Sequence, residues 1–170
     1  MGKKARNRMT RDTVPEGFSV PMALVDLVPV VFFGLSAVKA GSLFHSGLFI
    51  AGAVVCLLSG VVKVGWKLIA AVCQKNIWPM FMQMRILMPV GFLMLLAALV
   101  VDRGGLNGEA MLAGMTGFPA CLFFFLGALG MALMIYFAFR MDSSDPKVNW
   151  TEQIINSIAQ ICFFIGLLLA

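Results

Sequence analysis

The amino-acid sequence predicts an all-α integral membrane protein, built as a bundle of five transmembrane helices. Of its 170 residues, 61% are hydrophobic and only 12% are charged, whereas a soluble domain carries about a quarter charged residues. Several apolar runs also approach the ~20 residues that a helix needs to cross a bilayer. The chain has too little polar surface for a soluble protein, so we expect one membrane domain over residues 20–170.

The expected elements follow from the positions of the apolar runs. Residues 1–19 form a polar tail with five basic residues, and we expect this tail to lie near anionic lipid headgroups. The predicted spans cover residues 20–40, 47–70, 81–101, 118–140 and 151–170. Pro21 suits a first helical turn, where a missing N–H costs nothing. Pro29 lies inside the first span, where it leaves the carbonyl of Val25 without its helical donor.

The distribution of basic residues predicts the orientation of the bundle. With the N-terminus in the cytoplasm, eleven of the thirteen lysines and arginines fall on the inner side. The positive-inside rule therefore favours an N-in, C-out protein, and we expect it in the cytoplasmic (plasma) membrane. Because topology explains the basic residues, the excess of positive charge does not indicate a nucleic-acid partner.

Small residues in the second span indicate close helix packing. Gly52, Cys56 and Gly60 recur every four residues and form a ridge that lets another helix approach closely. The four cysteines lie in or beside different apolar runs, without a C-x-x-C motif. Since the chain also has a single histidine, we expect no metal site and no cofactor.

The candidate site lies in the cytoplasmic half of the predicted bundle, where all five spans carry polar residues. Asp26 lies about six residues into the first span, and Lys63 and Asn156 lie at a comparable depth in the second and fifth spans. Intramembrane charges are costly and are often functional. The candidate substrate-binding residues are Asp26, Ser59, Lys63, Lys67, Arg85, Tyr136, Asn156 and Gln160.

Two interpretations of this cluster compete. In the structural one, Asp26 and Lys63 form a buried ion pair that Asn156 and Gln160 cap, and the pair specifies how the helices pack. In the functional one, the cluster lines a net-positive, cytoplasm-facing pocket. Lys67 lies near the end of its predicted span, where snorkelling to the surface explains it, so Lys63 is the stronger candidate.

The sequence favours a small transporter or channel-like protein over two alternatives. An excess of lysine and arginine over aspartate favours a small anionic solute or a lipid headgroup as the ligand. The first alternative is a non-catalytic subunit or assembly factor, docked into a larger membrane complex through the glycine ridge and Met-rich helix faces. The second is a lipid-modifying enzyme, which is less favoured because no nucleophile motif or pair of acids is evident. The expected partners are membrane lipids and either a second copy or a larger complex.

Overall fold

The computed structural model describes residues 18–105, 108–141 and 146–170, and within these ranges the protein is helical without β-strands. Nearly all of the basic tail predicted for residues 1–19 lies outside the described residues. A short 3₁₀ helix covers Arg103–Gly105. The α-helices are α1 (Val20–Phe44), α2 (Gly47–Cys73), α3 (Trp78–Val101), α4 (Gly108–Thr116), α5 (Ala120–Arg140) and α6 (Pro146–Leu169).

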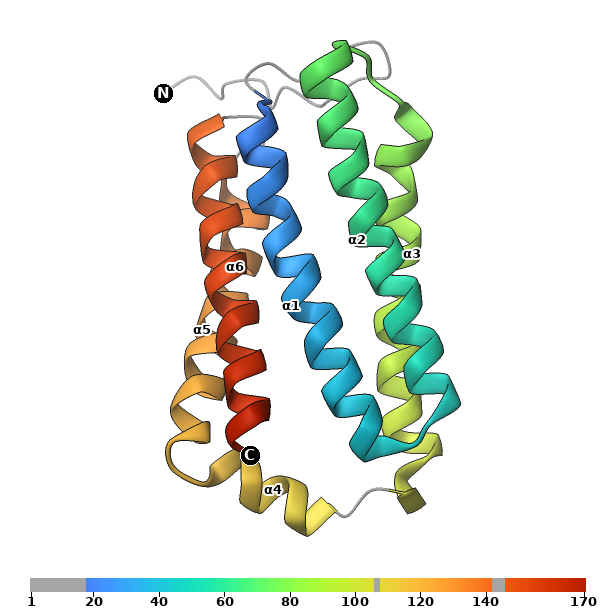
Figure 1. Ribbon diagram of the computed structural model, residues 1–170, viewed down its shortest axis with the longest axis vertical. Coiled ribbons are helices and arrows are strands. Elements are labelled where there is room, and N and C mark those ends of the chain that lie inside the picture. The colour runs from blue at the N-terminus through green and yellow to red at the C-terminus, as the bar shows by residue number, and fades with distance from the viewer. Residues whose placement is uncertain (1–17, 106–107, 142–145) are drawn as a thin grey trace.

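All the α-helices except α4 are long and apolar enough to cross a membrane. This confirms the prediction of a five-helix transmembrane bundle. Successive long helices run in opposite directions, so the beginning of α1 and the C-terminus lie at opposite ends of the bundle (Figure 1). We call the two ends the α1-start end and the C-terminal end. Which of them faces the cytoplasm stays a prediction.

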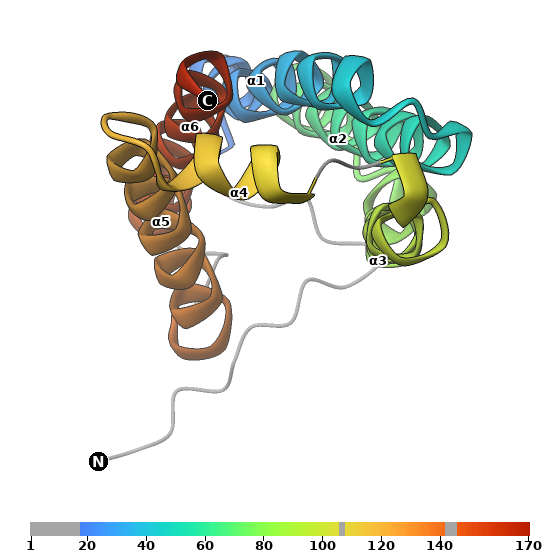
Figure 2. The same cartoon turned by 90° about the horizontal axis from the view of Figure 1, so that it is seen from below.

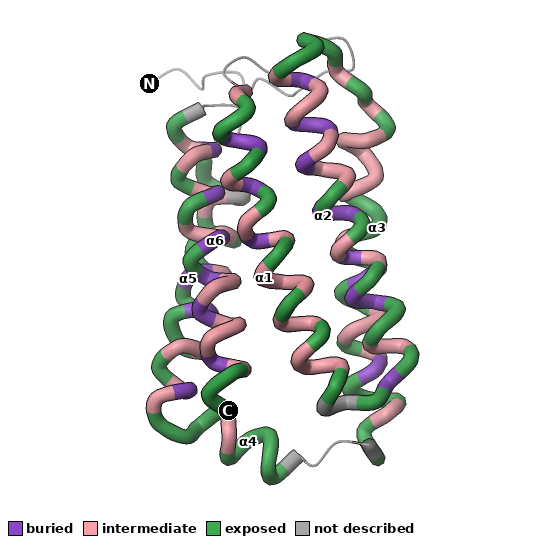
Figure 3. The backbone as a smooth tube through the Cα atoms, viewed as in Figure 1, coloured by how far each residue is buried: buried purple, intermediate pink, exposed green. Residues whose placement is uncertain are grey.

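The five long helices form an arc in the order α5, α6, α1, α2 and α3 (Figure 2). The neighbours in this order pack against each other, and α4 lies across the C-terminal end of the arc. As the end helices, α3 and α5 leave many large apolar side chains exposed, which suits contact with lipid. Examples on these two helices are Ile86, Leu93, Leu96, Val100, Phe125, Ile135 and Phe139. The burial pattern along each helix is shown in Figure 3.

Small residues allow close contacts at the interfaces of α2. A Cβ on Gly52 would lie 2.9 Å from the carbonyl oxygen of Gly91 on α3, and one on Gly60 would lie 2.9 Å from a methyl group of Val30 on α1. The ridge therefore acts as a helix-packing surface, as its spacing indicates. However, it is buried inside the bundle. The expectation that this ridge docks a larger complex is wrong, because α1 and α3 already cover it.

Two helix boundaries differ from the predicted spans in ways that affect the site, and one further helix was not predicted. α2 continues to Cys73 and stops where Gln74 adopts the left-handed conformation, a common helix terminator. α6 begins at Pro146, a residue suited to a first helical turn. α4 also forms within 102–117, which lies between two predicted spans. The predicted ends followed the loss of hydropathy, whereas backbone hydrogen bonding extends the helices beyond it.

Replacing Gly52 by alanine tests the contact between α2 and α3. The added Cβ meets the backbone of Gly91 and Leu95 at 2.9–3.0 Å, so we expect Gly52→Ala to lower the free energy of unfolding by about 1–3 kcal/mol. The measurement is unfolding of the purified protein by SDS in a mild detergent. The matched control is Gly47→Ala, whose Cβ meets no heavy atom of the described residues within 4 Å. Equal stabilities of the two variants would contradict this helix contact.

Cysteine labelling tests the N-in, C-out orientation. Cys73 is exposed near the α1-start end, and Gly104 lies at the opposite end with open space around its Cβ. Because Cys121 is half-exposed near the opposite end, the test uses the Cys121→Ser protein. A membrane-impermeant maleimide is expected to label this protein in inverted vesicles and not in right-side-out vesicles. The variant Cys73→Ser/Gly104→Cys is expected to show the reverse pattern. Labelling of both proteins from the same side would show that α3 does not cross the membrane. A swapped pattern would show the opposite orientation.

Candidate functional site

A buried cluster of three charges joins α1 and α2. Nζ of Lys67 lies 2.9 Å from Oδ2 of Asp26, and Nζ of Lys63 lies 3.2 Å from Oδ1. The lysines are four residues apart on α2, so both side chains lie on one helix face and reach the same carboxylate. Asp26 is 2% exposed and Lys67 is 4% exposed, whereas the Lys63 side chain is 28% exposed. The predicted contact between Asp26 and Lys63 is therefore present.

The structure corrects the interpretation of Lys67 as a snorkelling surface residue. From Lys67 to the end of α2 at Cys73 is six residues, about 9 Å along the helix axis. Asp26 lies six residues from the start of α1, at a matching depth. The longer helix therefore places Lys67 inside the bundle. Burying a charge is costly unless it is paired, and Asp26 provides the pairing charge.

A polar network on α6 holds Lys67 from the other side. Oδ1 of Asn149 accepts hydrogen bonds from Nζ of Lys67 at 3.3 Å and from Nε2 of Gln153 at 3.0 Å. The Ser157 hydroxyl donates to the backbone carbonyl of Gln153 at 2.8 Å. These three α6 residues are buried. The network thus links α6 to α2, and through Asp26 to α1.

Aromatic side chains cover the cluster near the α1-start end. Trp66 is only 2% exposed, and its indole N–H donates to Oδ1 of Asn76 at 3.0 Å. Its ring packs against Phe18 and Phe81, with centroid distances of 5.5 and 5.0 Å. Nζ of Lys67 also lies 5.6 Å from the Phe18 ring centroid, within cation–π range. This cover excludes water, and in a low-dielectric surrounding the ion pairs are stronger.

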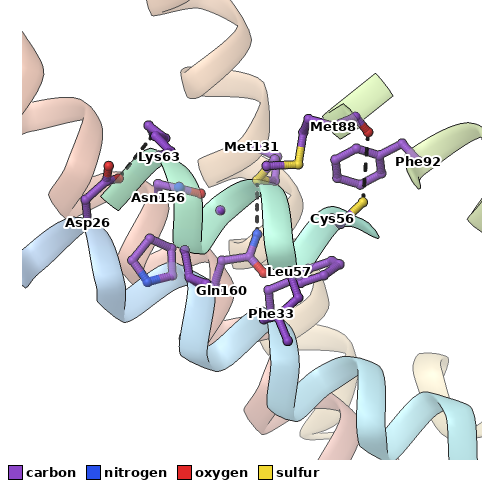
Figure 4. Close-up of a pocket in the computed structure, with 13 residues that line it drawn as sticks. Asp26, Phe33, Cys56, Leu57, Lys63, Met88, Phe92, Met131, Asn156 and Gln160 are labelled. Atoms are coloured by element: carbon purple, nitrogen blue, oxygen red, sulfur yellow. Dashed lines mark hydrogen bonds and ion pairs between the residues drawn. The ribbon is translucent and has the colours of Figure 1, made fainter. Parts of the chain in front are cut away.

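A cavity of about 160 Å³ adjoins the charged cluster near the middle of the bundle. Side chains from all five long helices line it. Asp26, Lys63 and Asn156 lie on one side of the cavity, and apolar side chains such as Leu57 and Phe92 lie farther along it (Figure 4). The lining residues are Asp26, Pro29, Val30, Phe33, Cys56, Leu57, Gly60, Lys63, Met88, Phe92, Met131, Asn156 and Gln160.

Four of the predicted site residues meet at this cavity, and Lys67 is joined to it through Asp26. The four are Asp26, Lys63, Asn156 and Gln160. The predicted capping of the ion pair differs from the observed one, because the hydrogen bond from the cluster to α6 goes to Asn149. The Gln160 amide instead lies 3.8 Å from the sulfur of Met131.

The other three predicted residues lie away from the cavity. The carbonyl of Ser59 accepts a hydrogen bond from Nε2 of Gln83 at 3.1 Å, at the interface of α2 with α3. Arg85 is exposed, with its guanidinium 5.2 Å from the ring centroid of Phe81. Tyr136 is 54% exposed and stacks near Phe137 on α5. Depth along a helix brought these residues into the prediction, but the direction in which each one points excludes them.

Sequence reasoning did not include Asn149 and Gln153 among the site residues, although a signal was present. Asn149, Gln153, Asn156 and Gln160 follow one another at intervals of four, three and four residues. That spacing puts all four on one helical face. Placing the start of the span at residue 151 removed Asn149 from consideration. Extending the face one turn toward Pro146 identifies the residue that contacts Lys67.

Comparisons with protein-family models, curated proteins and solved structures find no match to this chain. Within the described ranges, histidine, cysteine and acidic residues form no group of three that could hold a metal ion. The fold and the site together define a polytopic helical membrane protein with a charged cavity inside its bundle. Chemically, the arrangement offers an ammonium group beside apolar walls.

Removing the acidic partner tests the charged cluster. Asp26→Asn leaves Lys67 buried without its counter-ion, so we expect a loss of about 3–5 kcal/mol in the free energy of unfolding. Adding Lys67→Met removes the uncompensated charge and is expected to restore most of this loss. The matched control is Asp26→Asn with Lys63→Met, which leaves Lys67 unpaired and is expected to stay unstable. The free energy of unfolding is measured by SDS unfolding. If Lys67→Met and Lys63→Met restore the stability of Asp26→Asn equally, Lys67 is not the buried partner of Asp26.

Proposed function

We propose that this protein is a small membrane transporter or channel-like protein whose substrate pocket is the cavity beside Asp26 and Lys63. In this proposal the pocket takes a small anionic solute or a lipid headgroup. The observation that carries it is a cavity lined by all five long helices, with Lys63 and Asp26 at its polar side and Lys67 buried behind Asp26. A charged group kept inside a membrane bundle is by default a candidate for function.

The two lysines differ in a way that favours an anionic ligand. Lys67 is buried and has both Asp26 and Asn149 as partners. A single lysine is enough to neutralise the carboxylate of Asp26. Lys63 is therefore the surplus cation of the triad, and it is the lysine that is partly exposed and lines the cavity. An anion in the cavity would give this ammonium a second partner.

Pro29 supports a site that can change shape. It lies in the middle of α1, lines the cavity, and cannot donate a hydrogen bond to the carbonyl of Val25. Helices bend most readily where this ladder is interrupted. The interruption lies three residues from Asp26. A bend there would move the carboxylate relative to the lysines of α2, which is the kind of motion that alternating access requires.

The subunit alternative is favoured by a different observation, the exposed outer faces of α3 and α5. These helices end the arc, so a partner helix could cover their apolar side chains. Membrane lipid would cover the same faces equally well. The alternative of a lipid-modifying enzyme gains little, because two lysines already hold the carboxylate of Asp26 and so reduce its capacity as a general base.

Flux measurements in proteoliposomes test the proposed function. We expect the wild-type protein to carry labelled inorganic phosphate or acetate, or to move a labelled anionic lipid between leaflets, above the rate of empty liposomes. Lys63→Met removes the surplus cation and is expected to lower that rate by about ten-fold or more, because about 1.4 kcal/mol of binding corresponds to ten-fold. Lys75→Met is the matched control, since Lys75 is exposed and does not line the cavity.

Two results would contradict the proposal. One is a folded wild-type protein whose flux equals that of empty liposomes for all these probes. The other is equal flux through the wild-type protein and the Lys63→Met variant. Purification of a folded protein only together with a second, different membrane protein would instead support the subunit alternative.

A further inference from the structure

One residue that lines the cavity, Phe92, is also exposed on the outside of the bundle. This residue lies on α3, and 44% of it is exposed. On the opposite side of the arc, Met131 of α5 also lines the cavity. Both end helices thus contribute to the cavity wall, α3 through Met88 and Phe92 and α5 through Met131. The arc is open between these two helices (Figure 2). A molecule dissolved in the bilayer could reach the cavity from this side.

The α1-start end of the site is less accessible. Lys67 and Gln153 are buried there and both donate to the buried Asn149. The Phe18 ring lies over Lys67 and packs against Trp66. A water-soluble anion arriving from this end would have to disrupt the polar network on the side of α1, α2 and α6. A molecule that enters from the bilayer between α3 and α5 would leave this network intact.

The walls of the cavity change from polar to apolar. Lys63, Asp26 and Asn156 form the polar side, whereas Phe33, Leu57, Met88 and Phe92 form the apolar side (Figure 4). Phe33 and Phe92 approach each other, with a centroid distance of 6.4 Å. A ligand that satisfies both sides carries a charged head and a hydrocarbon chain.

The volume favours one chain rather than two. An apolar cavity of about 150 Å³ holds a molecule of the size of benzene, and this cavity is of similar size at about 160 Å³. It therefore accommodates a head and the first few carbons of a single alkyl chain. The remainder of the chain would leave the cavity past Phe92 into the bilayer.

From these observations we infer that the ligand is a single-chain anionic amphiphile that enters from the bilayer between α3 and α5. Its head pairs with Lys63, which exchanges Asp26 for the ligand. Asp26 keeps Lys67 as its partner throughout, so the exchange leaves no unpaired carboxylate in the bundle. The alkyl chain lies against Phe33 and Leu57. This inference rests on the proposed function and narrows it to one class of ligand.

Binding of palmitate to the purified protein tests the inference. The protein is placed in nanodiscs of phosphatidylcholine, and binding of radiolabelled palmitate is measured together with its competition by other ligands. Monopalmitoylglycerol, which is neutral with the same chain, is expected to compete at least about ten-fold less well than unlabelled palmitate. Acetate and inorganic phosphate, which lack the chain, are expected to compete more weakly still.

Variants on the polar and apolar sides of the cavity test the recognition of the head group and of the alkyl chain separately. Lys63→Gln is expected to weaken palmitate binding about 10- to 100-fold, the range of a lost charge-assisted hydrogen bond. Lys63→Arg keeps the charge and is expected to retain binding, and the exposed Lys75→Gln is the matched control. Phe33→Ala is expected to weaken palmitate binding while leaving the weak competition by acetate unchanged. It also tests the chain site independently of the charged cluster.

The outcomes distinguish this inference from the proposed function. Equal competition by monopalmitoylglycerol and palmitate would overturn the inference, because the head would then not be recognised. Acetate or phosphate competing as well as palmitate would also overturn it, while the proposed anion pocket would stand. If palmitate binding is unchanged in both the Lys63→Gln and the Phe33→Ala variants, palmitate binds at another site and the inference is wrong. Absence of palmitate binding, with anion flux present, would refute this inference and leave the proposed function standing.

Discussion

The position of three helices depends on the pairing of Asp26 with Lys63 and Lys67. A carboxylate buried in a membrane bundle is stable only beside a counter-charge, so α1 and α2 must present these side chains to each other. Lys67 then needs a further acceptor, which Asn149 of α6 provides. Through these contacts one charged cluster sets which faces of α1, α2 and α6 meet.

The cavity follows from the way the outer helices attach to this centre. α3 packs on α2 through Gly52 and Gly91, and α5 packs on α6 through Gly130 and Ala159. These close contacts hold α3 and α5 at the two ends of the arc (Figure 2). The space on the inner side of the arc, next to Lys63, is the cavity. The same arrangement places the ammonium group of Lys63 beside this cavity.

The fold could be predicted from the sequence to a large extent, and the candidate site only in part. Five apolar segments predicted five long helices, and the structure has them. Asp26, Lys63 and Asn156, which were grouped by their depth, line one cavity. Arg85 and Tyr136, predicted in the same half of the bundle, do not line it and are exposed. Depth can be counted along the chain, whereas the direction of a side chain depends on how its helix is rotated in the bundle.

By itself, the sequence determined that this chain forms membrane-spanning helices, because the length and apolarity of a segment are local properties. It also determined that a few charged groups would be buried among them. The tertiary structure decided which lysine is the buried one. The continuation of α2 to Cys73 and the start of α6 at Pro146 place Lys67 and Asn149 one turn deeper than the apolar runs imply. Those few ångströms depend on backbone hydrogen bonding and on contacts between distant segments, which hydropathy does not record.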